Sequence, residues 1–584
     1  MLKTLAAQIK EYRAASIATP LFMILEVLME TVIPLLMASI VDKGIANGDL
    51  NHVYRIGAIM LFCAAVGLFG GLMGAKYGAK ASTGLAKNLR WAMFENIQRF
   101  SFANIDKFST AGLVTRMTTD VTSVQNAYQM ILRMCFRAPV SLICAMAMAF
   151  FINARLASIY LIAMLILGCI LALIIAKAMR YFSEVFKKYD EVNASVQENV
   201  NAIRVVKAYV REDYENQKFT KASQNLYKMF LKAEGIVAWN GPVMMTTIYT
   251  CILLISWVGA HMIVAGDLTT GELMSLMTYC ITILMNLMML SMIFVMVSMS
   301  MAAGRRIAEV IEEEPTIENP EAPVMTVKDG SIDFNHVFFT YKEGSDNVLS
   351  DIDLHIRSGE TVGVIGPTGS AKTSLVNLIS RLYDVSEGSV QVGGVDVRKY
   401  DLETLRNQVS VVLQKNVLFS GTILDNLRWG DENATEEECI EACRLACADE
   451  FIERMPKGYH TRIEQGGSNV SGGQKQRLCI ARALLKKPKV LILDDSTSAV
   501  DTATDARIRA AFAQYIPETT KIIIAQRISS VQDADRILVL EDGRVNGWGS
   551  HAQLLSSNAI YREIYEGQNQ GGGDFDHPQD GGEA

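Results

Sequence analysis

The feature that most limits the fold of this chain is a set of long apolar runs in its first half. A helix needs about 20 apolar residues to cross the hydrocarbon core of a bilayer. The runs that reach this length lie near residues 17–42, 54–79, 134–153, 157–179, 236–264 and 270–303. Because 20% of the 584 residues are nevertheless charged, a membrane part joined to a soluble part is expected.

The segments between these runs differ in length and charge. Residues 80–133 and 180–235 are long and polar, whereas 43–53, 154–156 and 265–269 are short. The basic residues of the two long segments include Lys80, Lys87, Arg90, Arg99, Lys107, Arg116, Lys187, Lys188, Arg204, Lys207, Arg211 and Lys218. Basic loops remain on the cytoplasmic side, so both termini are expected there. A helical apolar rhythm predicts that the long segments extend the membrane helices into the cytoplasm.

The second half of the chain has a different pattern. Prolines and acids in residues 312–329 indicate a linker after a transmembrane domain at 1–311. Strands alternate with Gly-rich turns and helices over 330–567, which predicts a soluble α/β domain. The Gly-rich, acidic residues 568–584 are expected to be disordered. The predicted fold class is therefore a multi-domain membrane protein: an all-α, six-helix membrane domain followed by an α/β phosphate-loop domain.

The clearest chemical motif is "GPTGSAKT", which follows the apolar run "TVGVI" and opens a helix. Backbone N–H groups of such a loop bind the phosphates of a nucleotide, the lysine reaches the terminal phosphates, and the hydroxyl after it binds Mg²⁺. The expected ATP-binding residues here are Gly366, Pro367, Thr368, Gly369, Ser370, Ala371, Lys372, Thr373 and Ser374. Ala371 replaces a glycine of the pattern, and a positive φ there would cost about 1–2 kcal/mol.

A second motif, "KVLILDD", places two carboxylates after an apolar run. Asp494 is expected to hold Mg²⁺ together with Thr373, as the acid at this position does in phosphate-loop enzymes. Asp495 lies where a carboxylate could polarise the water that attacks ATP.

A third motif makes the family resemblance specific. "VSGGQKQR" resembles the signature of ATP-binding cassette (ABC) transporters, and the order of phosphate loop, Gln414, signature and Asp494 is similar to that family throughout. The membrane half resembles the exporter type, known as type IV. The resemblance implies that Tyr341 stacks on adenine, that Gln414 senses Mg²⁺ and the γ-phosphate, and that Asp501 closes a loop between two sites.

The same resemblance implies a role in trans for the signature. Ser471, Gly472, Gly473 and Gln474 would contact ATP held by the other subunit of a head-to-tail cassette dimer. ATP and Mg²⁺ are the implied cofactors, and a second half-transporter is the implied partner.

Two positions depart from the family pattern. Asp495 stands where hydrolytic cassettes carry Glu, and Gln526 stands where they carry His. The shorter acid draws its carboxylate back by about 1.5 Å, and catalysis is sensitive at about 1 Å. Gln526 can donate a hydrogen bond but cannot carry a proton charge. We therefore expect a degenerate site with slow or absent hydrolysis. Gln465 also replaces the usual Glu before the signature.

Because the signature is intact, the chain is interpreted as the degenerate-site subunit of a bacterial heterodimeric ABC multidrug exporter. Its partner would carry the catalytic Glu and His and an altered signature. The alternatives are a homodimer with slow ATPase, a lipid or lipid-linked flippase and, less favoured because 312–330 holds no regulatory insert, an ATP-gated channel or regulatory subunit. The expected location is the cell membrane, as a multi-pass protein.

The substrate is expected to be a hydrophobic or amphipathic compound, either a drug or a membrane lipid. Glu26 and Glu30 lie one helical turn apart in the first span and would either attract cationic amphiphiles or bond between helices. The methionine-rich sixth span would either line an adaptable cavity or serve helix packing. No long basic stripe indicates nucleic acid.

Overall fold

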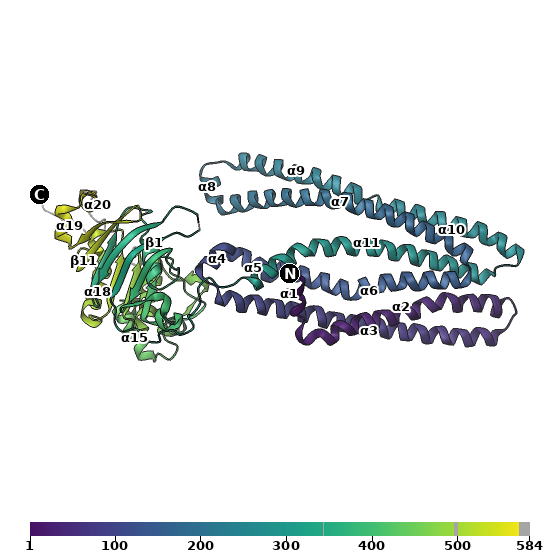
Figure 1. The fold of residues 1–584 in the computed structure, drawn as a ribbon, viewed down its shortest axis with the longest axis horizontal. Helices are drawn as coiled ribbons and strands as arrows, with labels where there is room; N and C mark the ends of the chain where they lie inside the picture. The colour runs from purple at the N-terminus through teal and green to yellow at the C-terminus, as the bar shows by residue number, and fades with distance from the viewer. Residues whose placement is uncertain (343, 496–499, 571–584) are drawn as a thin grey trace. The chain divides into compact units, whose positions relative to one another are not determined.

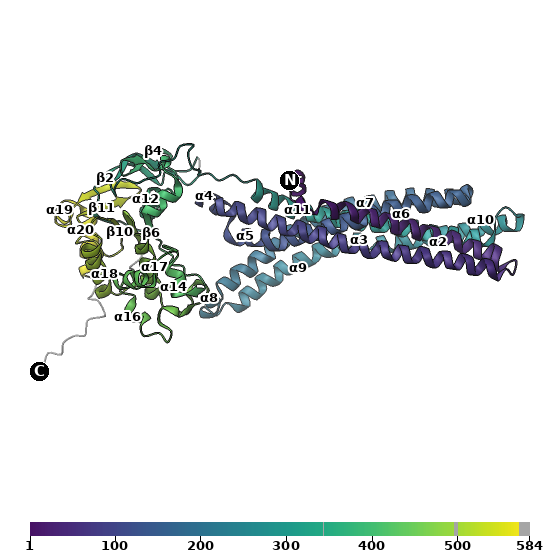
Figure 2. The same ribbon diagram turned by 90° about the horizontal axis from the view of Figure 1, so that it is seen from below.

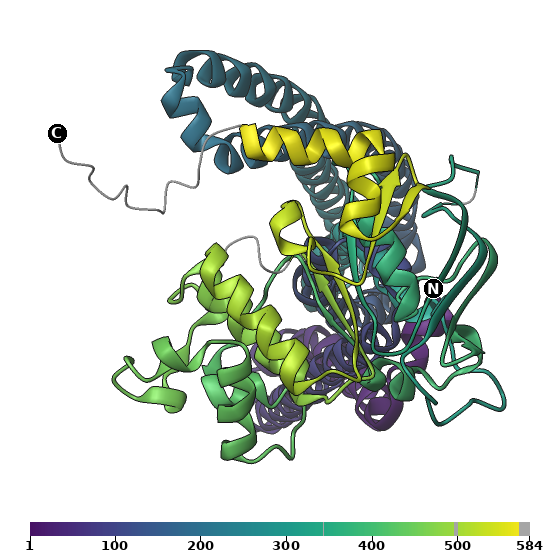
Figure 3. The same cartoon turned by 90° about the vertical axis from the view of Figure 1, so that its left-hand side faces the viewer.

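The computed structural model describes residues 1–342, 344–495 and 500–570. The chain divides into two units, shown from three directions in Figures 1, 2 and 3. The helical unit comprises residues 1–99 and 108–313, and the sheet unit comprises residues 100–107 and 314–584.

The helical unit is built almost entirely of helices, most of them long. They are α1 (Leu2–Ala7), α2 (Arg13–Ser39), α3 (Leu50–Arg99), α5 (Thr110–Thr115), α6 (Val121–Ile152), α7 (Ala154–Asn201), α8 (Ile203–Ala208), α9 (Glu212–Val237), α10 (Asn240–Ala265) and α11 (Thr270–Glu312). Among the residues that the structure describes, six helical segments are long and apolar enough to cross a bilayer. This confirms the predicted six-span fold, and the predicted extensions appear as the continuous length of α3 and α7.

Small residues and helix ends hold these helices together. A Cβ on Gly70 of α3 would lie 3.1 Å from the carbonyl oxygen of Phe22, so the glycine allows α2 and α3 to approach closely. Just beyond the end of α2, in the short π-helix Ile40–Ile45, the Asp42 carboxylate accepts hydrogen bonds from Thr269 and from the first turn of α11 at Gly271 N, at 2.6 and 2.8 Å. A carboxylate is favourable at a helix N-terminus, so this contact ties the two helices together.

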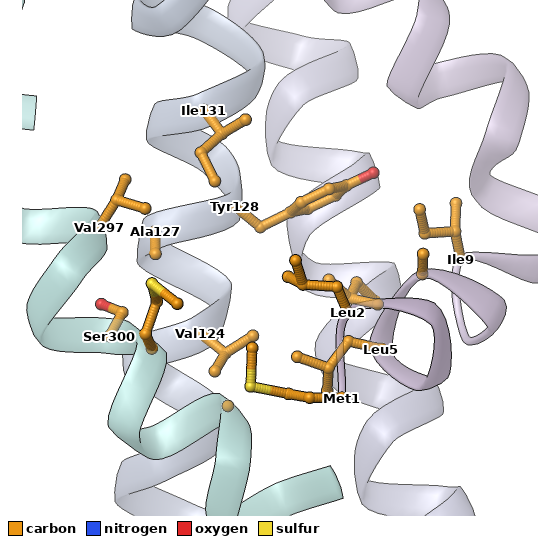
Figure 4. Close-up of a pocket in the computed structure, with 14 residues that line it drawn as sticks. Met1, Leu2, Leu5, Ile9, Val124, Ala127, Tyr128, Ile131, Val297 and Ser300 are labelled. Carbon is orange, nitrogen blue, oxygen red and sulfur yellow. The ribbon is translucent and has the colours of Figure 1, made fainter. Parts of the chain in front are cut away.

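Two apolar cavities lie among the described residues of the helical unit. The first, of about 200 Å³, lies between α1, α3, α6 and α11 and is shown in Figure 4, where Leu5 and Val124 border it. The second, of about 630 Å³, lies between α6, α7 and α11. Its α11 lining includes Leu287 and Phe294 and none of the methionines of the sixth span, so the methionines do not form this cavity.

In its described residues, the sheet unit combines a six-stranded, a four-stranded and a two-stranded sheet with helices. Its helices are α4 (Phe102–Phe108, all but its last residue in this unit), α12 (Lys372–Ile379), α13 (Leu402–Gln408), α14 (Ile423–Leu427), α15 (Glu436–Leu445), α16 (Asp449–Ile452), α17 (Gly472–Leu485), α18 (Thr502–Tyr515), α19 (His551–Ser557) and α20 (Ala559–Gln570). Its strands are β1 (Ile332–Phe339), β2 (Leu349–Ile356), β3 (Thr361–Ile365), β4 (Glu387–Val392), β5 (Val395–Asp396), β6 (Val409–Val412), β7 (Gly421–Thr422), β8 (Arg462–Ile463), β9 (Val490–Asp494), β10 (Thr520–Ile524), β11 (Arg536–Glu541) and β12 (Arg544–Gly549).

The larger sheet has the strand order β12-β11-β3-β10-β9-β6, and all its pairs except β11–β12 are parallel. Strands β9 and β10 are buried along their whole length, as expected for central parallel strands covered by helices. An antiparallel sheet of order β2-β1-β4-β5 packs beside it. Since β3, β10, β9 and β6 are neighbours, their carboxyl ends meet at one edge of the sheet.

The segment of α4 belongs to the sheet unit although it lies far away in the sequence. Asp106 accepts a 2.7 Å hydrogen bond from the Tyr383 hydroxyl, and the rings of Phe102 and Tyr383 lie 6.0 Å apart. The tip of the first long polar segment therefore docks on the α/β domain. The last helix, α20, ends at Gln570, and residues 571–584 of the predicted tail lie outside the described residues.

Candidate nucleotide site

The phosphate loop connects β3 to α12. Gly366 passes so close to β11 that a Cβ there would lie 2.1 Å from the Leu540 carbonyl oxygen, and Gly369 has φ +89°. Ala371 is the N-cap of α12 and adopts left-handed backbone angles, φ 69° and ψ 24°. The loop thus keeps the conformation of a phosphate loop. It does so although alanine occupies position 371, where the left-handed backbone angles favour glycine.

Lys372 and Thr373 begin α12 and meet the end of β9. The Thr373 hydroxyl bonds to both carboxylate oxygens of Asp494, at 3.0 and 3.1 Å. Lys372 Nζ donates to the carbonyl oxygens of Gly366 and Pro367, at 2.8 and 2.9 Å. Burial lowers the pKa of Lys372, while the charges of Asp494 and Asp495 oppose this. Burial also raises the pKa of Asp494, which is only 2% exposed, and the bond from Thr373 opposes that rise.

The residues at the two departing positions bond directly to each other. Gln526 Nε2 donates to Asp495 Oδ2 at 2.8 Å. Asp495 itself adopts φ 47° and donates its backbone N–H to the Ile524 carbonyl at 3.1 Å. Because β9 and β10 are parallel neighbours that end side by side, residues 31 positions apart come into contact here.

Sequence reasoning missed a further contact at this edge. The prediction of disorder from residue 568 onwards is wrong for Gln568, which lies in helix α20 and donates its side-chain amide to the Gln526 carbonyl at 2.8 Å. The same side chain accepts from Ile528 N at 2.8 Å. One glutamine therefore holds both sides of the turn that carries Gln526, and nothing in the Gly-rich composition of this region indicates it.

Gln414 follows β6 and lines a cavity of about 580 Å³ together with the phosphate loop, Asp494, Asp495 and Gln526. Tyr341 lies beside this group, because its hydroxyl bonds to Ser374 Oγ at 2.8 Å and its exposed ring packs edge-on against Tyr383. The structure thus brings the sequence-predicted nucleotide residues together.

The signature residues occupy a different part of the sheet unit and do not line this cavity. Ser471 is the N-cap of α17, where its Oγ accepts from Gln474 N and its N–H donates to Gln474 Oε1, at 3.3 and 2.9 Å. This capping box begins a helix at Gly472. The exposed helix N-terminus is suited to bind an anion.

The donor set at the phosphate loop fits a magnesium ion. Thr373 supplies a hydroxyl, Asp494 a carboxylate and Gln414 an amide oxygen, and Mg²⁺ prefers oxygen ligands. Bound there, the ion would neutralise charge on the phosphate oxygens. Thr373 and Asp494 would hold it, and Lys372 would turn from its loop carbonyls to the phosphates.

The membrane carboxylates have a basic partner that sequence reasoning missed. Arg137 of α6 donates through Nη2 to Glu30 of α2 at 2.8 and 2.9 Å and to Glu26 at 3.4 Å. Arg137 therefore links the two acids of α2 to α6 by hydrogen bonds. It lies in the run 134–153, which the sequence pattern indicates only as apolar.

A six-helix membrane unit joined to a phosphate-loop nucleotide unit defines the class of this protein, and comparison with known proteins gives the family. Residues 17–288 match the family model of the ABC transporter transmembrane region, and residues 349–498 match the ABC transporter family model. The chain is 37% identical over 560 residues to the uncharacterized ABC transporter ATP-binding protein YfiB of Bacillus subtilis, covering 96% of this chain and 97% of YfiB. It belongs to the ABC transporter family.

Two further comparisons extend this result. An ATP-dependent lipid A-core flippase of Desulfotalea psychrophila is 33% identical over 489 residues, which cover 83% of this chain and 84% of that protein. The structure of a bacterial Atm1-family ABC exporter with ATP bound superposes with a TM-score of 0.82 at 23% identity, covering 95% of this chain and 99% of that chain. The chain thus has an ABC exporter fold and is a multi-pass membrane protein with a cytoplasmic, ATP-binding domain.

Proposed function

We propose that this chain is the degenerate-site subunit of a heterodimeric ABC exporter that moves hydrophobic or amphipathic compounds out of the cytoplasm. ABC exporters work as dimers, either of two identical half-transporters or of two different ones. The observation that carries the proposal is the Gln526–Asp495 hydrogen bond beside an otherwise complete nucleotide site.

The proposal follows from what each group can do. Lys372, Thr373 and Asp494 would bind Mg²⁺ and ATP, and Tyr341 would stack on the adenine. The Asp495 carboxylate would act as base, but it is shortened and receives a hydrogen bond from an amide that cannot accept its proton. Loss of a general base or of a charged group lowers rates by about 10²–10⁴ each. ATP would therefore be held here and hydrolysed slowly.

The signature supports the second half of the proposal. Ser471 and Gln474 form a complete capping box, so the helix N-terminus that would face a partner's ATP is intact. This chain combines a weakly hydrolytic nucleotide site with an intact signature. It is therefore suited to a partner that combines a hydrolytic nucleotide site with an altered signature. The hydrolytic site of the complex would then pair Ser471–Gln474 of this chain with that partner.

The test restores the two departing side chains. Asp495→Glu combined with Gln526→His is expected to raise hydrolysis at this chain's site at least about 10²-fold. The assay uses a partner whose signature is repaired and whose own base is removed. Adding Lys372→Ala to the restored pair is the control, because it should abolish the gain by preventing ATP binding. An unchanged rate in the restored pair would show that these residues are not the defect.

A second candidate is a lipid flippase, and the lipid A-core flippase relative favours it. Both candidates predict the same nucleotide chemistry, and they differ in the compound that reaches the membrane unit.

A further inference from the structure

The membrane unit holds a cluster of charges on α2 and α6, which we call the charge cluster: Glu26, Glu30, Arg133 and Arg137. Glu30 lies 12 residues before Asp42, the residue that ties α2 to the outer end of α11. At 1.5 Å per residue this is about 18 Å along the helix. Because the hydrocarbon core is about 30 Å thick, we infer that Glu30 lies within the membrane-spanning part of α2.

Arg137 of α6 contacts both acids of α2. Arg137 Nη2 lies 2.8 Å from Glu30 and 3.4 Å from Glu26. Arg133, one turn earlier on α6, attracts the charge of Glu26 and packs its methylenes near Gly78 of α3. Two acids and two bases give the cluster no net charge. Such groups are costly in a membrane and mark functional sites by default.

The cluster is not saturated by its own contacts. In the described part of the chain, the buried Nε atoms of Arg133 and Arg137 have no hydrogen-bond partner. A buried donor without a partner costs about 1–3 kcal/mol. On the acidic side, Glu30 is 50% exposed although it bonds to Arg137. The arginines therefore need an acceptor, and the exposed carboxylate can still accept from a donor.

We propose that the charge cluster binds the headgroup of the transported amphiphile and that this headgroup is zwitterionic, with its ammonium on Glu30 and its phosphate or carboxylate on Arg133 and Arg137. A zwitterion keeps the cluster neutral, whereas a cation or an anion alone would add a net charge where desolvation is expensive. This inference rests on the proposed function, since it names the substrate class of the same exporter.

The test compares three probes with the same twelve-carbon tail: dodecylphosphoethanolamine, dodecylammonium and dodecyl phosphate. Binding is measured on the full-length protein purified from its native membranes in maltoside detergent, so that any partner subunit remains. The zwitterion is expected to bind at least about tenfold more tightly than either single charge, because it alone makes both charge-assisted contacts. Equal binding of all three, or tightest binding of either single charge, would overturn the proposal.

Variants locate the effect in the cluster. Glu30→Gln is expected to weaken zwitterion binding about tenfold. The double variant Glu30→Gln with Arg137→Gln removes both charges of that ion pair, so that neither remains without its partner. Its affinities for the three probes should differ by no more than about threefold. Arg155→Gln, an exposed site beyond the short turn at 153, is the matched control and should bind like the wild type. Unchanged zwitterion selectivity in Glu30→Gln and in the double variant would contradict the proposal.

The two proposals fail in different ways. ATP binding, which belongs to the sheet unit, is measured on every variant to show that the nucleotide site is unchanged, and the unfolding temperature of each full-length variant is measured as the check of folding. If the wild-type protein shows no headgroup selectivity but still has one slow and one fast nucleotide site, only the zwitterion site is refuted. Fast hydrolysis by the chain alone would refute the degenerate-site proposal whatever the probes show.

Discussion

Ala371 carries the clearest local strain at the residue scale. Its left-handed backbone angles cost an L-residue about 1–2 kcal/mol of folding stability. Glycine adopts these angles freely, but its more flexible unfolded state costs about 0.5–1 kcal/mol of folding stability. Ala371→Gly should therefore stabilise the protein by about 0.5–1 kcal/mol, or roughly 2 °C in thermal unfolding. Ala371→Val should do the opposite, because β-branching disfavours this conformation. A lower unfolding temperature for the glycine variant than for the wild type would contradict the account.

Residue-level chemistry was only partly predictable. The phosphate-loop spacing identifies Lys372 and Thr373 because backbone geometry fixes which residues face a phosphate. The Gln526–Asp495 bond was not predictable, since sequence places these residues 31 positions apart and only the pairing of β9 with β10 joins them. Arg137 was missed because one cation in a long apolar run does not interrupt its periodicity.

At the element scale, an ion pair fixes the cytoplasmic end of α11 to the start of α6. Arg306 donates Nε and Nη2 to the two oxygens of Asp120 at 2.7 and 2.6 Å, and Asp120 is 4% exposed. Arg306→Ala would leave this carboxylate buried without its main partner, so we expect a loss of about 3 kcal/mol and a lower unfolding temperature of the full-length protein.

Two further variants separate geometry from charge at this pair. Arg306→Lys keeps the charge but not the bidentate contact. Its unfolding temperature should therefore lie between those of Arg306→Ala and the wild type. Asp120→Asn combined with Arg306→Gln removes both charges. This double variant should recover most of the stability that Arg306→Ala loses. If Arg306→Ala unfolds at the wild-type temperature, the pair does not stabilise α11.

Helices were easier to predict than their contacts. Five of the six predicted spans lie inside one long helical segment each, and the third, 134–153, runs one residue past the end of its helix at Ile152. A run of about 20 apolar residues has few alternatives to a helix in a membrane. The contacts of Asp42 with α11 and of Asp106 with Tyr383 join residues more than 200 positions apart. They depend on tertiary packing, which periodicity alone does not specify.

At the scale of the whole molecule, the two parts of the chain divide the work. The sheet unit collects the nucleotide residues at the carboxyl ends of β3, β10, β9 and β6, and the helical unit carries the apolar cavities and the charge cluster. The order of motifs predicted this division because phosphate loop, signature and second acid occur together in the family. The partner remains a proposal, since its evidence is the contrast between the weakened base and the complete signature.

The central claim is that this chain holds ATP at a site that hydrolyses it slowly and completes the working site of another chain. The direct measurement is the ATPase rate of the full-length chain purified alone and then together with its partner. The account predicts a rate at least about 10²-fold higher for the complex, and it predicts that Ser471→Ala in this chain abolishes that increase. Equal rates for the chain alone and for the complex would contradict it.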